Sequence, residues 1–142
     1  GASNGIDKKF SEVSASENGD DFLVFARIVT GTDEIDYLLV LNASIQYKRK
    51  WDEFTLEEYD TQFNCNVKSS YFLTKKYSEA MKKKGWGRIV TIGSVNQYNQ
   101  HPELSLYGMT KAAQMKMTEN LAPLLAPYGI TINNVAPEED IS

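Results

Sequence analysis

Residues 89–111 read IVTIGSVNQYNQHPELSLYGMTK, and this stretch decides the fold of the chain. Residues 89–92 are a short apolar run rich in β-branched side chains, which predicts a buried strand. Ser94 follows at the strand end, where open α/β sheets place their ligands. After a polar loop, Tyr107 and Lys111 begin a helical segment, four residues apart and therefore on one face. The pattern predicts that a hydroxyl, a phenol and an ammonium group converge.

These three groups are suited to proton transfer between an alcohol and a carbonyl compound. A phenol whose pKa lies near its ordinary value of ~10 is a poor acid or base at neutral pH. A neighbouring ammonium group, here that of Lys111, favours the phenolate and brings the pKa of the phenol towards the working range. Ser94 can donate a hydrogen bond to a developing alkoxide or to a carbonyl oxygen.

The spacing of Tyr107 and Lys111 is a weak indicator by itself, because the chain has 8 tyrosines and Tyr71 stands at the same spacing from Lys75. Neither a strand nor a loop serine precedes that second pair in the same way, so we interpret it as ordinary helix surface. The distinguishing feature of the first pair is Ser94, thirteen residues before Tyr107.

A serine at a strand end, the Tyr-x-x-x-Lys motif and the N-x-V-x-P segment that ends at Pro137 together resemble the short-chain dehydrogenase/reductase family. Residues 36–137 follow the order of that family continuously. The resemblance implies an α/β fold, a Rossmann-like doubly wound parallel sheet, in a single domain over residues 1–142. Residues 36–137 would form its catalytic half, and residues 1–31 would be a remnant of the nucleotide-binding half.

The resemblance also implies a role for each motif residue. Tyr107 would be the general acid/base, Lys111 would hold the cofactor ribose, and Ser94 would polarise the substrate oxygen. Asn66 matches the family's fourth catalytic position, where an asparagine organises a water that contacts the lysine. From the residues alone, an asparagine inside a helix is merely tolerated. The implied activity interconverts a secondary alcohol and a ketone with NAD or NADP, and the sequence chooses neither the cofactor nor the small-molecule substrate.

The expected cofactor contacts come from three segments. Residues 1–6 resemble the family's glycine-rich phosphate loop without its leading threonine, and Asp7 stands where the last glycine is expected. Such glycines let the backbone approach a pyrophosphate at a helix N-terminus. Residues 42 and 43 match two positions of the family's N-N-A-G turn. The full expected set is Gly1, Ser3, Gly5, Ile6, Asn42, Ala43, Tyr107, Lys111 and Pro137.

The segment between Ile6 and Asp36 is too short for the rest of a nucleotide-binding half, because a single βαβ unit takes roughly 30 residues. Either the sequence joins pieces of a longer chain here, which we favour because the similarity is lost abruptly at residues 6–7, or the segment is truly deleted. The family's lid and final strand, which would follow Pro137, are also missing from the sequence. Residues 8–21 are polar and predict a loop or a poorly ordered segment. Residues 22–29 are apolar and could be a strand or a helix.

Four further patterns outline the rest of the chain. The apolar runs at residues 36–41 and 130–135 predict strands. Thr55 begins a capping-box pattern that marks a helix start, with a helix continuing over residues 61–83. Pro123 predicts a kink or an early end of the Tyr107 helix near Asn120, because proline costs ~3 kcal/mol in a helix interior. The loop residues at the places where family members line the substrate pocket are Gln97, Tyr98, Asn99, Gln100, His101 and Leu104.

Composition excludes several other classes of function. The net charge of −4 argues against non-specific nucleic-acid binding. The single cysteine, Cys65, excludes an internal disulfide and favours a reducing compartment, so we expect a cytoplasmic protein. No apolar run is long enough to span a membrane, no signal peptide is visible, and the lone His101 has no metal-binding partners. The family resemblance implies a homodimer or homotetramer, formed through the helices that start near Thr55 and Tyr107.

Two alternatives to an active dehydrogenase have some support in the sequence. A catalytically inactive dehydrogenase-fold protein with a binding or regulatory role is favoured by the altered phosphate loop and by Glu138, which stands in place of a glycine. Retention of the four catalytic-type residues opposes it. A serine hydrolase using Ser94 and His101 is disfavoured, because Asn96 occupies the position where a nucleophile elbow needs glycine.

Overall fold

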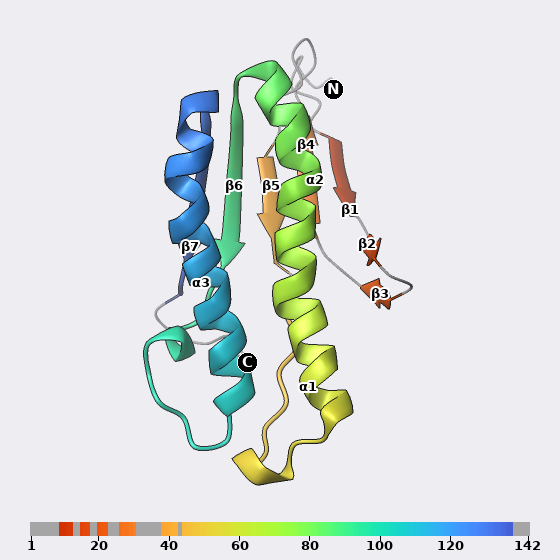
Figure 1. Ribbon diagram of the computed structural model, residues 1–142, viewed down its shortest axis with the longest axis vertical. Helices are drawn as coiled ribbons and strands as arrows, with labels where there is room; N and C mark the ends of the chain where they lie inside the picture. Colours follow the sequence, from red (N-terminus) through yellow and green to blue (C-terminus); the bar gives the residue numbers. More distant parts are fainter. Residues whose placement is uncertain are drawn as a thin grey trace.

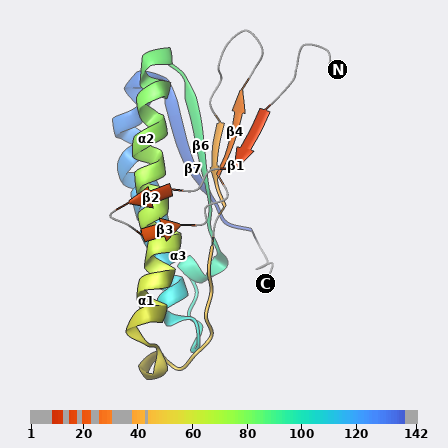
Figure 2. The ribbon, with the colours of Figure 1, turned by 90° about the vertical axis from the view of Figure 1, so that its right-hand side faces the viewer.

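The computed structural model describes residues 9–12, 15–17, 20–22, 26–30, 38–42 and 44–137. Within these residues, a sheet of five strands in the order β1–β4–β5–β6–β7 packs against long helices on one of its faces (Figures 1 and 2). The strands of this sheet are β1 (Lys9–Glu12), β4 (Ala26–Thr30), β5 (Leu38–Leu41), β6 (Gly87–Ile92) and β7 (Ile130–Val135). A separate antiparallel pair is formed by β2 (Ala15–Glu17) and β3 (Asp20–Phe22).

Strands β5, β6 and β7 are parallel and form the part of the sheet that the apolar runs predict. Ile89 in β6 is aligned with Leu39 on one side and with Ile132 on the other. All three side chains are buried, as expected for parallel strands under covering helices. The described part of the first run begins at Leu38, β6 begins two residues before the predicted Ile89, and β7 has the predicted bounds.

Strands β1 and β4 extend the sheet with antiparallel pairing. β4 pairs with β5 and β1 pairs with β4, both antiparallel. A parallel crossover needs a dozen or more residues, and only seven separate β4 from β5, which is consistent with their antiparallel pairing. The prediction of a loop is therefore wrong for the described residues 9–12, 15–17 and 20–21, where main-chain pairing forms strands without apolar periodicity. The undecided segment 22–29 holds the end of β3 and most of β4.

A nearly continuous helix precedes β6. It consists of α1 (Leu56–Phe63), the π-helical segment η2 (Asn64–Lys68) and α2 (Ser69–Lys84). Thr55 caps α1 with the predicted capping box, and the predicted helix over residues 61–83 is confirmed with the π-helical segment inside it. Gly85 ends α2 with a φ of 77°, a left-handed conformation that glycine adopts without strain.

The last helix, α3 (Ser105–Leu125), runs past Asn120 and contains Pro123. The predicted early end near Asn120 is therefore wrong. Pro123 lies in the final turn of α3, two residues before the helix ends at Leu125. Short 3₁₀ turns flank the helices at Trp51–Glu53, Val95–Gln97 and Ala126–Tyr128.

The hydrophobic core lies between the parallel strands and the helices α2 and α3 (Figure 2). It is built from Leu39, Leu41, Cys65, Leu73, Met81, Ile89, Leu125, Ile130 and Ile132. Cys65 is a free, buried cysteine, and its burial raises the pKa of its thiol. The core therefore holds the sheet and the helices in the arrangement that positions the strand ends.

The capping box predicts a specific loss of stability in acid. The carboxylate of Glu58 accepts a hydrogen bond from the backbone N–H of Thr55 and pairs with Arg49, and these contacts hold its pKa below the ordinary value of 4.5. A pKa that folding lowers contributes stability that is fully present above the ordinary value and is lost as the pH falls through the folded-state value.

We therefore expect Glu58→Gln to melt at a lower temperature than the wild type at neutral pH, with the difference closing as the pH falls below about 4. Thermal unfolding followed by circular dichroism over this pH range measures the difference. Glu57→Gln controls for negative charge near the helix N-terminus, because Glu57 makes no bond to Thr55 in the capping box. A difference that is equal at neutral and acid pH would contradict the assignment.

Candidate active site

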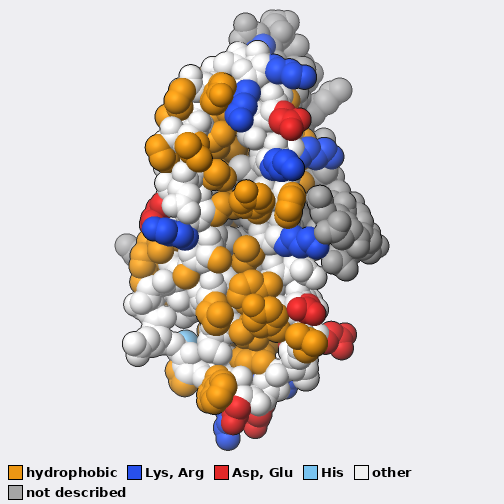
Figure 3. Space-filling view, viewed as in Figure 1, with side chains coloured by type: hydrophobic (Ala, Val, Ile, Leu, Met, Phe, Trp, Pro, Cys, Tyr) orange, Lys and Arg blue, Asp and Glu red, His pale blue; other side chains and the backbone are white. Residues whose placement is uncertain are grey.

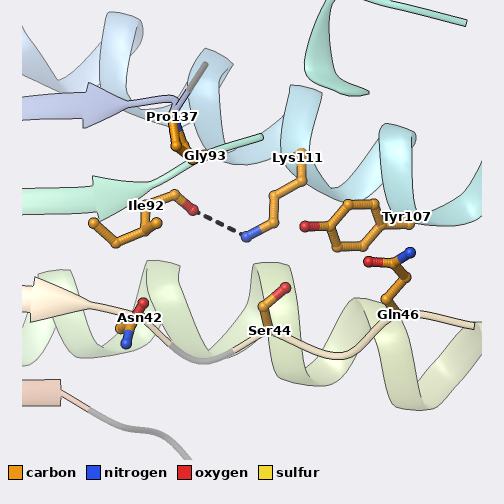
Figure 4. A pocket seen from close by; sticks show the side chains of 8 residues that line it. All are labelled: Asn42, Ser44, Gln46, Ile92, Gly93, Tyr107, Lys111 and Pro137. Carbon is orange, nitrogen blue, oxygen red and sulfur yellow. Dashed lines mark hydrogen bonds between the residues drawn. The ribbon is translucent and has the colours of Figure 1, made fainter. Parts of the chain in front are cut away.

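A pocket of about 370 Å³ lies at the carboxyl ends of the parallel strands (Figure 4). Asn42 follows β5, Gly93 follows β6 and Pro137 follows β7, so all three strand ends contribute to its wall. The complete lining is Asn42, Ser44, Gln46, Ile92, Gly93, Tyr107, Lys111 and Pro137. Open α/β sheets bind ligands at this edge, which makes the pocket the candidate site.

Gly93 lets the chain leave β6 at the floor of this pocket. Its N–H donates to the carbonyl of Val135, 2.7 Å away, which continues the pairing of β6 with β7 by one residue. A Cβ at this position would lie 2.5 Å from Oε1 of Gln97 and 2.7 Å from Oδ1 of Asn134, closer than real Cβ contacts. The crowding explains why a residue without a side chain stands there.

Lys111 is a buried lysine whose amine is held at the pocket. Its side chain is 2% exposed. Nζ donates to the carbonyl oxygen of Ile92 at 2.9 Å and to Oε1 of Gln114 at 3.3 Å. Both of these acceptors are neutral oxygens, one from the main chain and one from an amide side chain. The two bonds hold the amine at the wall of the pocket.

Tyr107 lies one helical turn before Lys111 and shares the pocket with it. Nζ of Lys111 is 5.6 Å from the centroid of the Tyr107 ring. Figure 4 shows the phenol oxygen pointing toward the lysine side chain. The ring is buried, with 7% of its surface exposed. The phenol and the ammonium group are thus brought together as the spacing on α3 predicts.

Ser94 is fully buried next to Gly93 and is not one of the pocket's lining side chains. Its Oγ accepts the N–H of Asn96 at 3.1 Å and so caps the turn Val95–Gln97. This local bond places the serine at the predicted strand end. Its convergence with Tyr107 on one reacting oxygen stays a prediction.

Asn66 lies in the π-helical segment η2 and connects three parts of the molecule. Its side-chain oxygen accepts the N–H of Ile45 at 2.8 Å, and its amide nitrogen donates to the Ile45 carbonyl at 2.9 Å. The same nitrogen donates to Oγ1 of Thr110 on α3 at 3.0 Å, and that hydroxyl donates to the carbonyl of Tyr107. Asn66 is fully buried. It therefore ties the segment after β5 to the helix that carries Tyr107.

The residues expected to contact the cofactor and the substrate lie partly in the pocket, partly away from it and partly outside the described residues. Of the expected cofactor-binding residues, the pocket contains Asn42, Tyr107, Lys111 and Pro137. Gly1, Ser3, Gly5, Ile6 and Ala43 lie outside the described residues. The loop residues expected at the substrate pocket line no part of this cavity; Gln97 is buried, whereas Tyr98 and His101 are exposed.

Sequence reasoning missed several residues that the structure brings to the site. Ser44, Gln46, Ile92 and Gly93 line the pocket. The available signal was their nearness to predicted strand ends: Ile92 and Gly93 stand at the end of the strand 89–92, and Ser44 and Gln46 follow the strand 36–41 by three and five residues. Gln114 contacts Lys111 from one turn further along α3, and the spacing of three residues from the lysine was its only signal.

Within the described ranges, no three His, Cys, Asp or Glu side chains gather in a way that could hold a metal ion. Among the same residues, no helix has the length and apolar character needed to cross a membrane.

The comparison with known protein families decides the classification. Residues 1–139 match the family described as short chain dehydrogenase. The chain belongs to this family. The resemblance of the motif from Ser94 to Lys111 is thereby confirmed at the level of the family.

Individual relatives agree with the short-chain dehydrogenase assignment. The chain is 35% identical over 100 residues to a D-beta-hydroxybutyrate dehydrogenase of Rhizobium meliloti, a match that covers 70% of the chain and 39% of the relative. It is 30% identical over 133 residues to an acetoacetyl-CoA reductase of Cupriavidus necator, covering 94% of the chain and 54% of the relative. The chain thus spans about half or less of the length of these relatives.

A solved structure shows the shared fold directly. A gluconate 5-dehydrogenase from Burkholderia cenocepacia, crystallised with NADP and tartrate, superimposes with a TM-score of 0.70 at 30% identity. The match covers 72% of this chain and 40% of that one. The predicted Rossmann-like parallel sheet with helices is therefore confirmed for this short-chain dehydrogenase chain, in an incomplete form.

Proposed function

We propose that the protein is an NAD- or NADP-dependent oxidoreductase that interconverts a secondary alcohol and a ketone. The observation that carries the proposal is the buried Tyr107–Lys111 pair in a pocket at the carboxyl ends of three parallel strands. A phenol beside a fixed cation is an arrangement for proton transfer to and from an alcohol oxygen. The family and the NADP-containing relative support the same chemistry.

The residues fit a nicotinamide cofactor at this pocket. Its volume of about 370 Å³ is in the range of small-molecule sites, and its wall combines main chain, polar side chains and one cation. Asn42, Lys111 and Pro137 would hold the nicotinamide end, with the lysine bound to the ribose. When bound, the cofactor supplies or accepts the hydride.

The chain's own groups would manage the proton and the substrate oxygen. In the reducing direction, Tyr107 gives its phenol proton to the carbonyl oxygen as the carbon–hydrogen bond forms, and the ammonium group of Lys111 stabilises the phenolate that remains. In the oxidising direction the phenolate takes the alcohol proton. Ser94 would donate a hydrogen bond to the reacting oxygen, and Asn66 would keep the lysine and tyrosine in register through Thr110 and Gln114.

Titration of the purified protein with NADH and with NADPH, followed by the nicotinamide fluorescence, tests this proposal. We expect one of them to bind with a micromolar dissociation constant, and we expect turnover with some member of a panel of hydroxy acids, sugar acids and β-ketoacyl thioesters. Binding without turnover of any member would favour the inactive dehydrogenase-fold alternative. Absence of both binding and turnover would overturn the proposal.

We also propose that the protein assembles as a homodimer or homotetramer through α2 and α3. Figure 3 shows hydrophobic side chains gathered over the face that these helices present. Tyr71 is 49% exposed and Leu124 is 65% exposed there, beside a groove of about 200 Å³. An apolar surface of this kind marks an interaction site more often than a free one. A cytoplasmic location is proposed from the free, buried thiol of Cys65.

A further inference from the structure

Gln114 is a buried polar residue that contacts both the lysine of the candidate site and the π-helical segment. It lies three residues after Lys111 on α3, and only 1% of its side chain is exposed. Its Oε1 accepts from Nζ of Lys111 at 3.3 Å. Its Nε2 donates to the main-chain carbonyl of Asn66 and, at 3.1 Å, to the hydroxyl of Ser70. Burial of an amide is costly unless it is hydrogen-bonded, and here both of its ends have partners.

The partners of Gln114 determine which way its amide points. The ammonium group of Lys111 can only donate, so the end of the amide that meets it must be the oxygen. The carbonyl of Asn66 can only accept, so the other end must be the NH₂ group. A reversed amide would place donor against donor and acceptor against acceptor. The orientation is therefore fixed by chemistry as well as by packing.

The result is a chain of hydrogen bonds from the π-helical segment to the lysine. Asn66 is itself anchored by Ile45 and Thr110, so its carbonyl is a rigid support for the amide of Gln114. From the opposite direction, the carbonyl of Ile92 at the end of β6 holds the same amine. The amine is thus held between a strand end and a helix, at the place where the Tyr107 hydroxyl points toward it (Figure 4).

We propose that Gln114 is a positioning residue for Lys111. Its NH₂ group is bound to the Asn66 carbonyl, and its oxygen holds the lysine amine beside the Tyr107 phenol. An amide neither gives up nor takes up a proton near neutral pH, so its contribution is position and not acid–base chemistry. The catalytic consequence rests on the proposed oxidoreductase function, whereas the holding of the amine does not.

The holding of the amine is tested without any substrate. Hydrogen-bonded, buried N–H groups exchange their protons slowly. In protein with isotope-labelled lysine, we expect an ammonium signal that disappears in Lys111→Met and so belongs to Lys111. Gln114→Met, which keeps the length of the side chain but has no comparable acceptor, should broaden or abolish this signal. Gln114→Glu keeps an acceptor for the amine but loses the NH₂ donor to the Asn66 carbonyl, so its signal should be weaker than that of the wild type and stronger than that of Gln114→Met. A signal that is the same in the wild type and Gln114→Met would overturn the inference.

The catalytic consequence is tested by kinetics. For Gln114→Met we expect kcat for alcohol oxidation to fall about tenfold, roughly the loss of one hydrogen bond to a charged group. The acid limb in the pH profile of this kcat should move to higher pH. Gln114→Glu should move that limb further, because its negative charge opposes a phenolate. A Gln114→Met variant that is less stable but has an unchanged kcat and pH profile would show a merely structural role and overturn the catalytic part.

Gln62→Met provides the matched control. Gln62 is also a fully buried glutamine, on α1, and its recorded amide bond goes to the main chain of Glu58 and not to the lysine. This variant should leave the Lys111 signal and the pH profile unchanged. If the wild type shows neither cofactor binding nor turnover, the proposed function fails, and the ammonium signal alone decides on the position of the lysine.

Discussion

Replacing Tyr107 with phenylalanine is expected to lower turnover roughly 100- to 10,000-fold, the usual contribution of a general acid or base. The ring stays in place, because phenylalanine fills the same buried volume and only the phenol oxygen is lost. Binding of NADH or NADPH should change little, since the other lining residues of the pocket remain. Steady-state rates and a fluorescence titration on the same preparation separate the two effects.

The chain contains its own control for this experiment. Tyr71 stands at the same spacing from Lys75 that Tyr107 has from Lys111, but it is 49% exposed on α2 and far in sequence from the strand ends. Tyr71→Phe should leave turnover unchanged. Equal activity of the wild type and Tyr107→Phe would remove the general acid/base from the proposed mechanism.

Replacing Asn66 with alanine is expected to destabilise the fold by about 3 kcal/mol or more. The side chain makes three buried hydrogen bonds, to the N–H and the carbonyl of Ile45 and to the hydroxyl of Thr110. Each partner left buried without a bond costs roughly 1–3 kcal/mol. For a chain of this size the melting temperature should fall by about 10 °C. Urea unfolding and thermal unfolding both measure the loss.

Two further variants make the stability test specific. Asn66→Asp keeps an oxygen for the N–H of Ile45 but no donor for Ile45 and Thr110, so we also expect it to be less stable than the wild type. Asn120→Ala, at an exposed position of α3, should change stability by less than about 0.5 kcal/mol. A loss for Asn66→Ala no larger than that for Asn120→Ala would mean that the connection between Ile45 and α3 does not stabilise the protein.

The parallel strands and the main helices could be predicted because their signals are local. The apolar run of β6 and the Thr55 capping box depend on residues within a few positions of one another, and both are present. The antiparallel strands β1 and β4 could not be predicted in this way. Their pairing joins segments that no local pattern relates, and residues 9–12, in which Phe10 is the one apolar residue, show no apolar alternation.

In the candidate site, too, contacts within one helix could be predicted and contacts between distant segments could not. The spacing of Tyr107 and Lys111 on one helix face predicted their meeting, because the helix repeat alone fixes it. The partner of Lys111 outside α3 had no such signal. Ile92 is 19 residues away and acts through its main chain. Gln114 belongs to the site because its amide meets a carbonyl 48 residues earlier in the chain.

The sequence by itself determined the family, the parallel strands of the sheet and the pairing of a phenol with an ammonium group on one helix. These three features depend on hydrophobic periodicity and on short spacings between residues, and both can be found in the sequence alone. The tertiary structure was needed to show that Ser94 is buried outside the pocket lining and that Asn66 and Gln114 connect the helices to the lysine. Hydrogen bonds between distant segments depend on how the layers pack, and packing brings together residues that no local pattern relates.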